Sequence, residues 1–322
     1  QEEFMALSRM LDGASDQRGT EHSMALGLLD IAALHYLYGP NPEARTGDDV
    51  YTVDSARSNF IWDGAGFDTL DASLSLQAVT LFLEPGRHGF VGVSPADSIF
   101  AAGQQTVNFG TRIEKLVGSE FADSLTGDEF ANVFVGGGGS DEIVGGAGID
   151  TAVFTASYAS ASVIQGVDSW RITLSGETDV LSGIERLEFS DRAIALDLHG
   201  NAGETAKLIG VLLGPAALDD LDLVRAALGF ADTDLGLEGM LALGLEILLG
   251  TSPSAEEVIN LIHNALTGAN ASTMLVTDYA NRINRAEMTA VELALLAAET
   301  DLNHDNIDLI GLSNHGLAYA LG

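Results

Sequence analysis

The spacing of apolar residues near the start of the chain is that of a helix. In "SMALGLLDIAALHYLYGPNP" the apolar positions that recur three to four residues apart are Leu28, Leu29, Ala32, Ala33, Tyr36 and Leu37. Residues at this interval share one face of a helix, so we predict a helix over 28–38. Gly39 and Pro40 follow and end it, because proline cannot continue the helical hydrogen bonds.

The rest of the chain divides into a stretch with strand-like alternation and a stretch with helical spacing. Residues 43–200 contain short alternating segments such as "WRITL" and "AIALDL", separated by Gly and Asp turns, which predicts strands. Residues 201–322 are rich in Leu and Ala at helical intervals, and Ser254 with Glu257 has the spacing of a capping box. We therefore predict an N-terminal helical segment over 1–42, followed by a β region and a separate all-α domain.

Four nine-residue repeats lie inside the β region. They read "VGSEFADSL", "TGDEFANVF", "VGGGGSDEI" and "VGGAGIDTA", and they begin at Val117, Thr126, Val135 and Val144. The positions that fall in register are Gly118, Gly127, Gly136 and Gly145, then Asp123, Asn132, Asp141 and Asp150; Gly138 and Gly148 are further turn glycines of the last two repeats. A flexible linker would not keep four registers with an apolar residue in phase, so we interpret the repeats as structured.

The period Gly-Gly-x-Gly-x-Asp-x-apolar-x is typical of a calcium-binding parallel β-roll. Calcium takes about six to eight oxygen ligands, and glycine turns can aim carbonyl oxygens inward while Asp adds carboxylate oxygens. Because two repeats make one coil, turns two repeats apart should stack. We therefore predict ions between Asp123 and Asp141 on one side and between Asn132 and Asp150 on the other. The first two repeats are degenerate, which predicts fewer filled sites than repeats.

The charge of the chain narrows the range of partners. There are 47 acidic and 14 basic residues, and the formal net charge is −33. Such a charge repels nucleic acid and anionic membranes and favours cations. The chain has no cysteine, which excludes disulfides and thiolate metal sites, and no apolar run is long enough to span a membrane. The opening "QEEFMALSRM" lacks the layout of a cleaved signal peptide, so we expect any export signal towards the C-terminus.

The repeats resemble those of the RTX family of proteins, which bacteria export by type I secretion. The flanking segments "LLDIAALHYLYGPN", "ARTGDDVYTV", "IWDGAGFDTLDAS" and "TRIEKLVGS" look like the C-terminal half of serralysin-type zinc proteases. The resemblance implies a secreted, extracellular or cell-surface protein whose β region is an RTX-type β-roll, a form of parallel β-helix, with several bound Ca²⁺ ions.

The same resemblance implies two further calcium sites before the repeats. The first consists of the carbonyls of Arg45, Gly47 and Ala65 and the side chains of Asp49, Asp63 and Asp68. The second shares Asp68 and adds the carbonyls of Gly66 and Arg112 and the side chain of Glu114. Asp49 stands where the family usually has Thr, and Ala65 stands where it often has Gly. Neither difference removes an oxygen ligand.

The catalytic motif of these proteases is missing from the sequence. The family holds zinc with a His-Glu-x-x-His pair, because two imidazoles four residues apart lie on one helix face. The chain has seven histidines, no two of which are four residues apart. "EFMALSRM" aligns with the Met-turn of the family, with Leu7 at the methionine position or with Met5 in a shifted register. We expect no zinc and no peptidase activity in the chain as given.

Two segments after the repeats also have RTX counterparts. "SWRITLSGETDVLSGIERLEFSDRAIALDL" resembles the antiparallel strands that cap an RTX roll and cover its open edge. The helical stretch from about residue 203 resembles a domain of unknown function found near the C-termini of secreted RTX proteins. Within it, "DLNHDNID" resembles the start of an EF-hand loop, but Asn306 replaces the loop glycine and Leu312 replaces the bidentate Glu.

Two functions from different classes follow. The first is a non-enzymatic, secreted calcium-binding protein that acts as a surface, adhesion or assembly component, with the helical domain contacting a protein or the cell surface. The second is the C-terminal part of a secreted serralysin-like zinc endopeptidase whose catalytic helix lies upstream of Gln1. Other hydrolases are disfavoured because no Gly-x-Ser-x-Gly elbow is present, and "GGGGSD" lacks the Gly-Lys-Ser/Thr ending of a phosphate loop.

Overall fold

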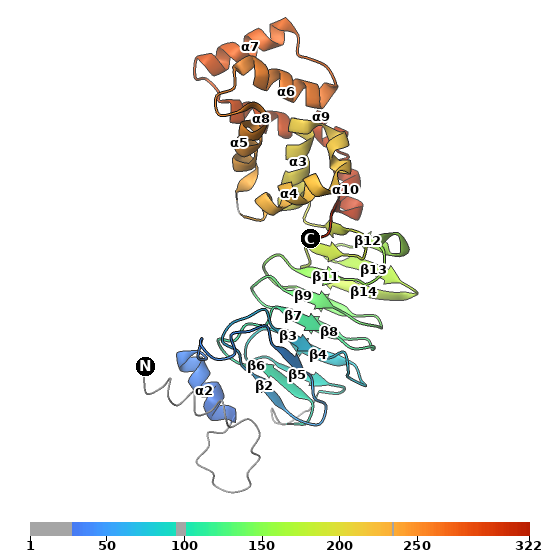
Figure 1. Cartoon of the computed structure of the whole chain (residues 1–322). Helices are drawn as coiled ribbons and strands as arrows, with labels where there is room; N and C mark the ends of the chain where they lie inside the picture. Colours follow the sequence, from blue (N-terminus) through green and yellow to red (C-terminus); the bar gives the residue numbers. More distant parts are fainter. Residues whose placement is uncertain (1–27, 95–100, 234) are drawn as a thin grey trace. The chain divides into compact units, whose positions relative to one another are not determined.

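The computed structural model describes residues 28–94, 101–233 and 235–322, which form two compact units (Figure 1). The first unit lies within residues 1–184 and the second covers 185–322. Helix α2 (Leu28–Tyr38) has the bounds that the apolar spacing predicts. The alignment of "EFMALSRM" with a Met-turn lies outside the described residues. The predicted domain boundaries at residues 42 and 200 stay predictions.

Two sheets make up most of the first unit. In one sheet the parallel strands lie in the order β1, β3, β7, β9, β11. Their bounds are Val50–Thr52, Thr69–Asp71, Lys115–Val117, Val133–Val135 and Thr151–Val153. The other sheet has the order β12, β13, β14, β10, β8, β4, β5, β6, β2. In chain order its bounds are β2 Asn59–Ile61, β4 Val79–Phe82, β5 His88–Val91, β6 Gln104–Val107, β8 Ser124–Thr126, β10 Glu142–Val144, β12 Ser162–Gln165, β13 Trp170–Leu174 and β14 Glu177–Ser182.

The repeats produce strands that alternate between the two sheets. The chain passes from β7 to β8, then to β9, β10 and β11, so strands that neighbour each other within one sheet are two repeats apart. Leu116 accordingly pairs with Phe134, and Leu125 pairs with Ile143. The nine-residue interval of the sequence thus sets the register of the parallel strands that the repeats form. Figure 1 shows β7, β9 and β11 as successive strands of one sheet. Strands β12, β13 and β14 are antiparallel, and β14 joins β10 in parallel.

The core of the first unit contains one nearly fully buried apolar residue from each of several strands. These residues are 0–1% exposed and alternate with partly exposed neighbours: Leu70, Leu81, Leu116, Leu125, Phe134, Ile143, Ala152 and Leu181. Burying one large apolar side chain stabilises the fold by about 1.5–3 kcal/mol. A three-residue strand contributes only one such side chain, so contacts in the turns must supply much of the remaining stability.

The second unit combines helices with a small antiparallel sheet. Strands β15 (Arg186–Glu188), β16 (Ala193–Ala195) and β17 (Leu317–Tyr319) pair in that order. The helices are α3 (Asn201–Leu213), η2 (Pro215–Asp219), α4 (Leu221–Ala231), α5 (Gly236–Leu249), α6 (Ala255–Thr267), α7 (Thr273–Asn284), α8 (Ala290–Ala298), α9 (Asp301–Asn306) and α10 (Leu309–His315). The region predicted as all-α therefore also contains a strand, β17, which is held by its pairing with β16.

Conventional apolar packing holds the second unit together. Leu241, Val258 and Ala294 belong to one buried cluster, and Ile209 and Val224 belong to another. The predicted capping box of Ser254 and Glu257 is present at the start of α6. The residues of the EF-hand-like stretch form helix α9 instead of a loop, and its Asn303 is fully buried. Among the described residues no helix has the length and hydropathy needed to cross a membrane.

Candidate metal centre

The turns between the repeat strands stack at two edges of the sheets. The first edge carries turns 118–123 and 136–141, which lead from β7 to β8 and from β9 to β10. The second edge carries turns 127–132 and 145–150, which lead back to the first sheet. Successive turns touch through their backbones, because the Gly138 N–H donates to the Ser119 carbonyl at 2.9 Å and the Ala147 N–H donates to the Asp128 carbonyl at 3.1 Å.

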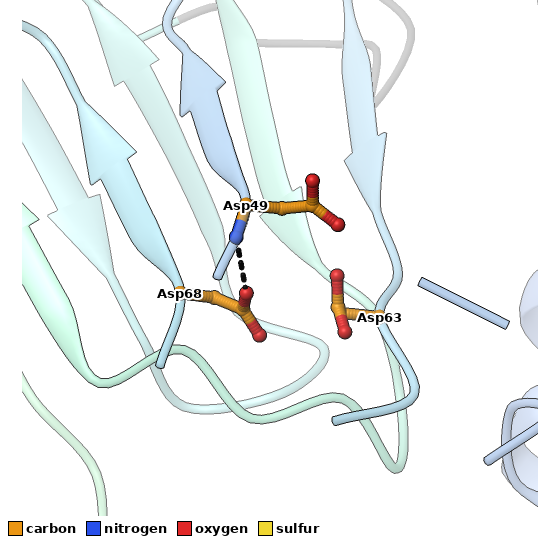
Figure 2. Close-up of side chains that lie close together, drawn as sticks. All are labelled: Asp49, Asp63 and Asp68. Carbon is orange, nitrogen blue, oxygen red and sulfur yellow. Dashed lines mark hydrogen bonds between the residues drawn. The ribbon is translucent and has the colours of Figure 1, made fainter. Parts of the chain in front are cut away.

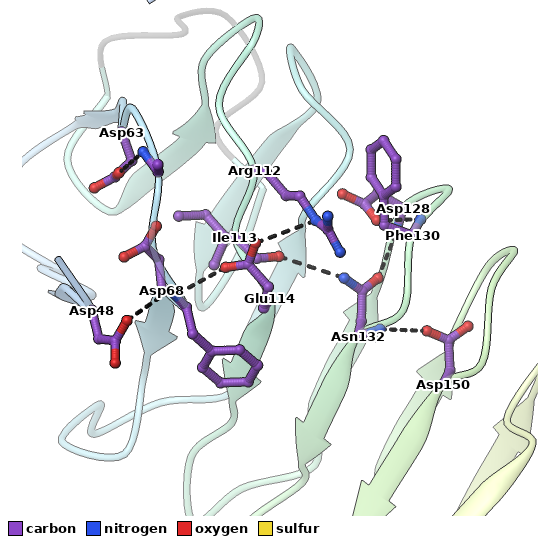
Figure 3. Close-up of polar contacts among 12 residues, drawn as sticks. Asp48, Asp63, Asp68, Arg112, Ile113, Glu114, Asp128, Phe130, Asn132 and Asp150 are labelled. Carbon is purple, nitrogen blue, oxygen red and sulfur yellow. Dashed lines mark hydrogen bonds and ion pairs between the residues drawn. The ribbon is translucent and has the colours of Figure 1, made fainter. Parts of the chain in front are cut away.

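A ladder of side-chain oxygens runs along the second edge. The N–H of Asp49 donates to Asp68 Oδ1 at 2.8 Å, and the N–H of Asp68 donates to Glu114 Oε2 at 2.8 Å. Further along, the N–H of Asn132 donates to Asp150 Oδ1 at 2.8 Å (Figure 3). Each side chain therefore accepts a hydrogen bond from the equivalent position of a preceding coil, and one of its oxygens is committed to the fold.

A matching ladder runs along the first edge and reaches beyond the predicted residues. The N–H of Val79 donates to Asp123 Oδ1 at 2.7 Å, and the N–H of Asp123 donates to Asp141 Oδ1 at 2.9 Å. The N–H of Asp141 then donates to Asp179 Oδ1 at 3.0 Å. Sequence reasoning missed Asp179, although "DVLSG" at 179–183 repeats the Asp-x-apolar-x-Gly pattern of "DEIVG" at 141–145. Asp179 lies in β14, and the next three residues of that strand, 180–182, pair in register with β10.

Three carboxylates meet at the start of the second-edge ladder. One oxygen from each of Asp49, Asp63 and Asp68 lies within 4.8 Å of the others, and Figure 2 shows the side chains around one space. Asp63 and Asp68 are buried, whereas Asp49 is partly exposed. The hydroxyl of Tyr51 donates a short hydrogen bond to Asp63. The predicted first site therefore brings its three acidic side chains together.

A buried oxygen in this cluster lacks a partner within the described part of the chain. Asp68 is 1% exposed, and its Oδ2 accepts no hydrogen bond, while its Oδ1 is held by the Asp49 N–H. A buried carboxylate oxygen without a partner is costly, because it has lost its hydration without replacement. A cation bound between Asp49, Asp63 and Asp68 would remove that cost. Oxygen ligands alone suit a hard ion such as Ca²⁺.

Several carboxyl groups of the two ladders have raised pKa values, which means that their charged forms are disfavoured. Burial raises the pKa of Asp68 to about 6, and the nearby charges of Asp63, Glu114 and Asp49 act in the same direction. Burial also raises the pKa of Asp141 to about 7, and the charges of Asp179, Asp123 and Glu177 add to the shift. The pKa values of Asp123 and Asp179 are raised as well, in both cases mainly by burial. The charged form of these edges therefore calls for a compensating positive charge.

Of the predicted carbonyl ligands, those of Arg45 and Gly47 lie beside the cluster. The Arg45 carbonyl accepts a hydrogen bond from the Ala65 N–H at 3.3 Å. A Cβ atom on Gly66 would lie 2.2 Å from the Gly47 carbonyl oxygen and 2.8 Å from Asp68 Oδ1, so only glycine allows this approach. These contacts place backbone oxygens of the two turns next to the three carboxylates.

The predicted second site already contains a positively charged side chain, that of Arg112. Arg112 Nε lies 3.2 Å from Glu114 Oε1, and the other oxygen of Glu114 accepts the Asp68 N–H. Both oxygens of Glu114 thus have protein partners in this structure (Figure 3). The Arg112 guanidinium also lies over the ring of Phe130, 4.4 Å from its centre. Whether Glu114 and the carbonyls of Gly66 and Arg112 bind an ion stays a prediction.

The glycines of the repeats allow carbonyl oxygens to approach the ladders. A Cβ atom on Gly118 would lie 2.1 Å from the Gly136 carbonyl oxygen, and one on Gly127 would lie 2.1 Å from that of Gly145. A Cβ atom on Gly145 would lie 1.9 Å from the carbonyl oxygen of Gly183. Gly183, which closes the "DVLSG" pattern, is therefore a second residue that sequence reasoning missed. Gly138 differs, since its nearest neighbour would be Glu120 Oε2 at 3.1 Å.

Comparisons with known proteins agree with this geometry. The family model of the RTX calcium-binding nonapeptide repeat matches residues 117–152 with four copies, which confirms the repeats read from the sequence. A serralysin from Proteus mirabilis is 39% identical over 79 residues, which cover 20% of this chain and 16% of that protein. The match thus spans about a sixth of the curated relative. The chain therefore contains RTX calcium-binding repeats, and it is similar to serralysin over part of its length.

Proposed function

We propose that this chain is a secreted calcium-binding RTX protein in which residues 43–200 fold as a β-roll around several Ca²⁺ ions. The observation that carries the proposal is the pair of carboxylate ladders, which begin at the Asp49, Asp63 and Asp68 cluster on one edge and end at Asp179 on the other. Buried carboxylates with raised pKa values and inward-facing carbonyl oxygens support a hard divalent cation as the missing partner.

Calcium would act as a folding ligand in this proposal. Without a cation, the ladders hold like charges close together in a partly buried setting, which opposes folding. The unfolded chain has no preformed site, so the free energy of binding becomes free energy of folding. The β region would stay largely unfolded at low calcium inside the cell and fold outside it, which suits export by type I secretion.

The proposal is tested by calcium binding to the full chain. Isothermal titration calorimetry and native mass spectrometry would give the affinity and the number of ions. We expect Asp141→Asn with Asp150→Asn to raise the calcium concentration at half-saturation about tenfold or more, since two charged ligands become neutral. Asp168→Asn, at an exposed turn between β12 and β13, is the matched control and should leave it unchanged. Equal affinities for both variants would contradict the proposal.

The second unit would serve as a contact module in a surface, adhesion or assembly component without enzymatic activity. Its helices expose large apolar side chains, among them Met274 at 83% and Ile247 at 69%. A groove of about 900 Å³ lies along α3 and α6, with Leu212 and Leu261 in its wall and Glu256 at its rim. Exposed apolar surface of this kind supports a role in binding another protein. Purification under native conditions, followed by identification of the chains that stay bound, tests this role.

A second candidate is the C-terminal part of a secreted zinc endopeptidase. The observation that favours it is the 39% identity to serralysin over 79 residues. This function requires a His-Glu-x-x-His helix upstream of Gln1, because the chain itself does not contain that motif. Sequencing the gene upstream of Gln1 distinguishes the two candidates. A zinc-binding motif in the same reading frame would favour the peptidase, whereas an unrelated upstream region would favour the non-enzymatic protein.

A further inference from the structure

The four repeat turns have two different backbone conformations. In turns 136–141 and 145–150 the second and fourth residues have positive φ angles: Gly137 101°, Gly139 100°, Gly146 121° and Gly148 108°. The corresponding residues of turns 118–123 and 127–132 are Ser119, Phe121, Asp128 and Phe130, and none of these four has a positive φ. A positive φ is strained for residues other than glycine. The two earlier turns therefore follow a different path from the two later ones.

Ser119 closes the earlier turn on the first edge. Its N–H donates to Asp123 Oδ2 at 2.5 Å, and its hydroxyl lies 2.9 Å from both oxygens of the same carboxylate. The Ser119 hydroxyl also accepts the N–H of Phe121 at 3.2 Å. Since the Val79 N–H donates to Asp123 Oδ1, both oxygens of Asp123 already have protein partners.

Asp128 closes the earlier turn on the second edge in the same way. Its N–H donates to Asn132 Oδ1 at 2.9 Å, and its own Oδ1 accepts the N–H of Phe130 at 2.8 Å. The acceptor at the sixth position of this turn is a neutral amide, so it introduces no charge that a cation must balance. Both earlier turns thus have a bond from their second residue to their sixth, and a bond from their fourth residue to the side chain of their second.

The later turn on the first edge has neither closing bond. Within the described contacts, the carboxylate of Asp141 accepts one hydrogen bond, from the Asp123 N–H at 2.9 Å, and Gly137 does not donate to it. Gly137 also has no side chain that could accept the N–H of Gly139. Asp141 is 2% exposed and the Asp123 N–H bonds to its Oδ1, so its Oδ2 is the oxygen left for a ligand from outside the chain.

We infer that Ser119 and Asp128 replace a cation in the two earlier turns, so that calcium in the repeats is bound by turns 136–141 and 145–150. This inference rests on the proposed calcium-binding function and assigns a structural role to Asp123 and Asn132. The earlier turns then form a base that becomes ordered before the later turns. The later turns bond directly onto them, through the Gly138 N–H to the Ser119 carbonyl and the Ala147 N–H to the Asp128 carbonyl.

Hydrogen exchange across a calcium titration of the full chain tests this inference. Mass spectrometry of peptides that cover 118–132 and 136–150 reports the two pairs of turns separately. In the unaltered chain we expect peptide 118–132 to become protected at a calcium concentration about tenfold lower than peptide 136–150, because two hydrogen bonds close each earlier turn. In the double variant that carries Ser119→Gly and Asp128→Gly, both peptides should become protected at the same calcium concentration.

Ser119→Thr keeps the hydroxyl and is the conservative control, which should behave like the unaltered chain. If the double glycine variant does not fold at any calcium concentration, Ser119→Ala removes the hydroxyl alone and should raise the concentration for peptide 118–132 a few-fold. Equal concentrations for both peptides in the unaltered chain would overturn the inference, as would an unchanged profile in the glycine variants. A chain that binds no calcium at all would instead overturn the proposed function.

Discussion

The two units of the molecule are held together by different means. In the first unit a three-residue strand buries one side chain, such as Leu116 or Ile143, and hydrogen bonds to carboxylates connect the coils. In the second unit the helices α3, α4, α5, α6 and α8 each bury several residues, and α5 alone contributes Leu237, Met240, Leu241 and Leu245 to the core. The first unit therefore depends on the balance of charge at its edges, whereas the second depends on apolar area removed from water.

Of the predicted effects, removal of calcium should produce the largest difference between the stabilities of the two units. With an excess of chelator, we expect the strand signal in far-ultraviolet circular dichroism to be lost while the helical signal is largely kept, because only the ladders need a cation. Addition of calcium should restore the strand signal. A first unit that stays folded after exhaustive chelation, with no calcium detected by mass spectrometry, would show that the ladders are stable without an ion.

A cavity in the helical core should destabilise the second unit by the same amount with and without calcium. Leu241 is fully buried in the larger apolar cluster of the second unit. We expect Leu241→Ala to lower the free energy of unfolding of that unit by about 2–5 kcal/mol, with the same loss in calcium and in chelator. Urea titration followed by the helical signal measures this value. Leu302→Ala, at a 47% exposed site on α9, is the control and should cost far less. A calcium-dependent loss would mean that the units are coupled.

Acidity should partly replace calcium in the first unit. In chelator, the pKa values of Asp68 and Asp141 are about 6 and about 7, above the usual value of an unfolded Asp. The folded state then binds more protons than the unfolded state, so its stability falls as the pH rises from about 4 to about 7. In chelator, we therefore expect more of the strand signal in circular dichroism to persist at pH 5 than at pH 8. The second unit should change little, since its raised pKa, at Tyr319, is about 12. A strand signal that increases from pH 5 to pH 8 in chelator would contradict the raised pKa values of the ladder carboxyls.

The repeats were predictable because their nine-residue interval is written in the sequence. That interval places Asp123 and Asp141 on one edge and Asn132 and Asp150 on the other, as the structure shows. Asp179 was missed because the β12 and β13 hairpin interrupts the interval, although the five-residue pattern around it survives. The closing role of Ser119 could not be read from the sequence, since it depends on the φ angles of the turn. Strand β17 was missed because three residues in a Leu- and Ala-rich stretch have no helical or strand period of their own.

The eighteen-residue offset between Asp123 and Asp141 also limits how the length of such a chain can vary. Loss or duplication of two whole repeats would leave every remaining acidic side chain on its own edge, in line with its neighbours. Loss of the single repeat 126–134 would transfer all later turns to the opposite edge, so that Asp141 would stack after Glu114 instead of after Asp123. A change of two repeats should therefore be tolerated, whereas a change of one repeat should disrupt the fold. Related chains should then differ in length by whole coils.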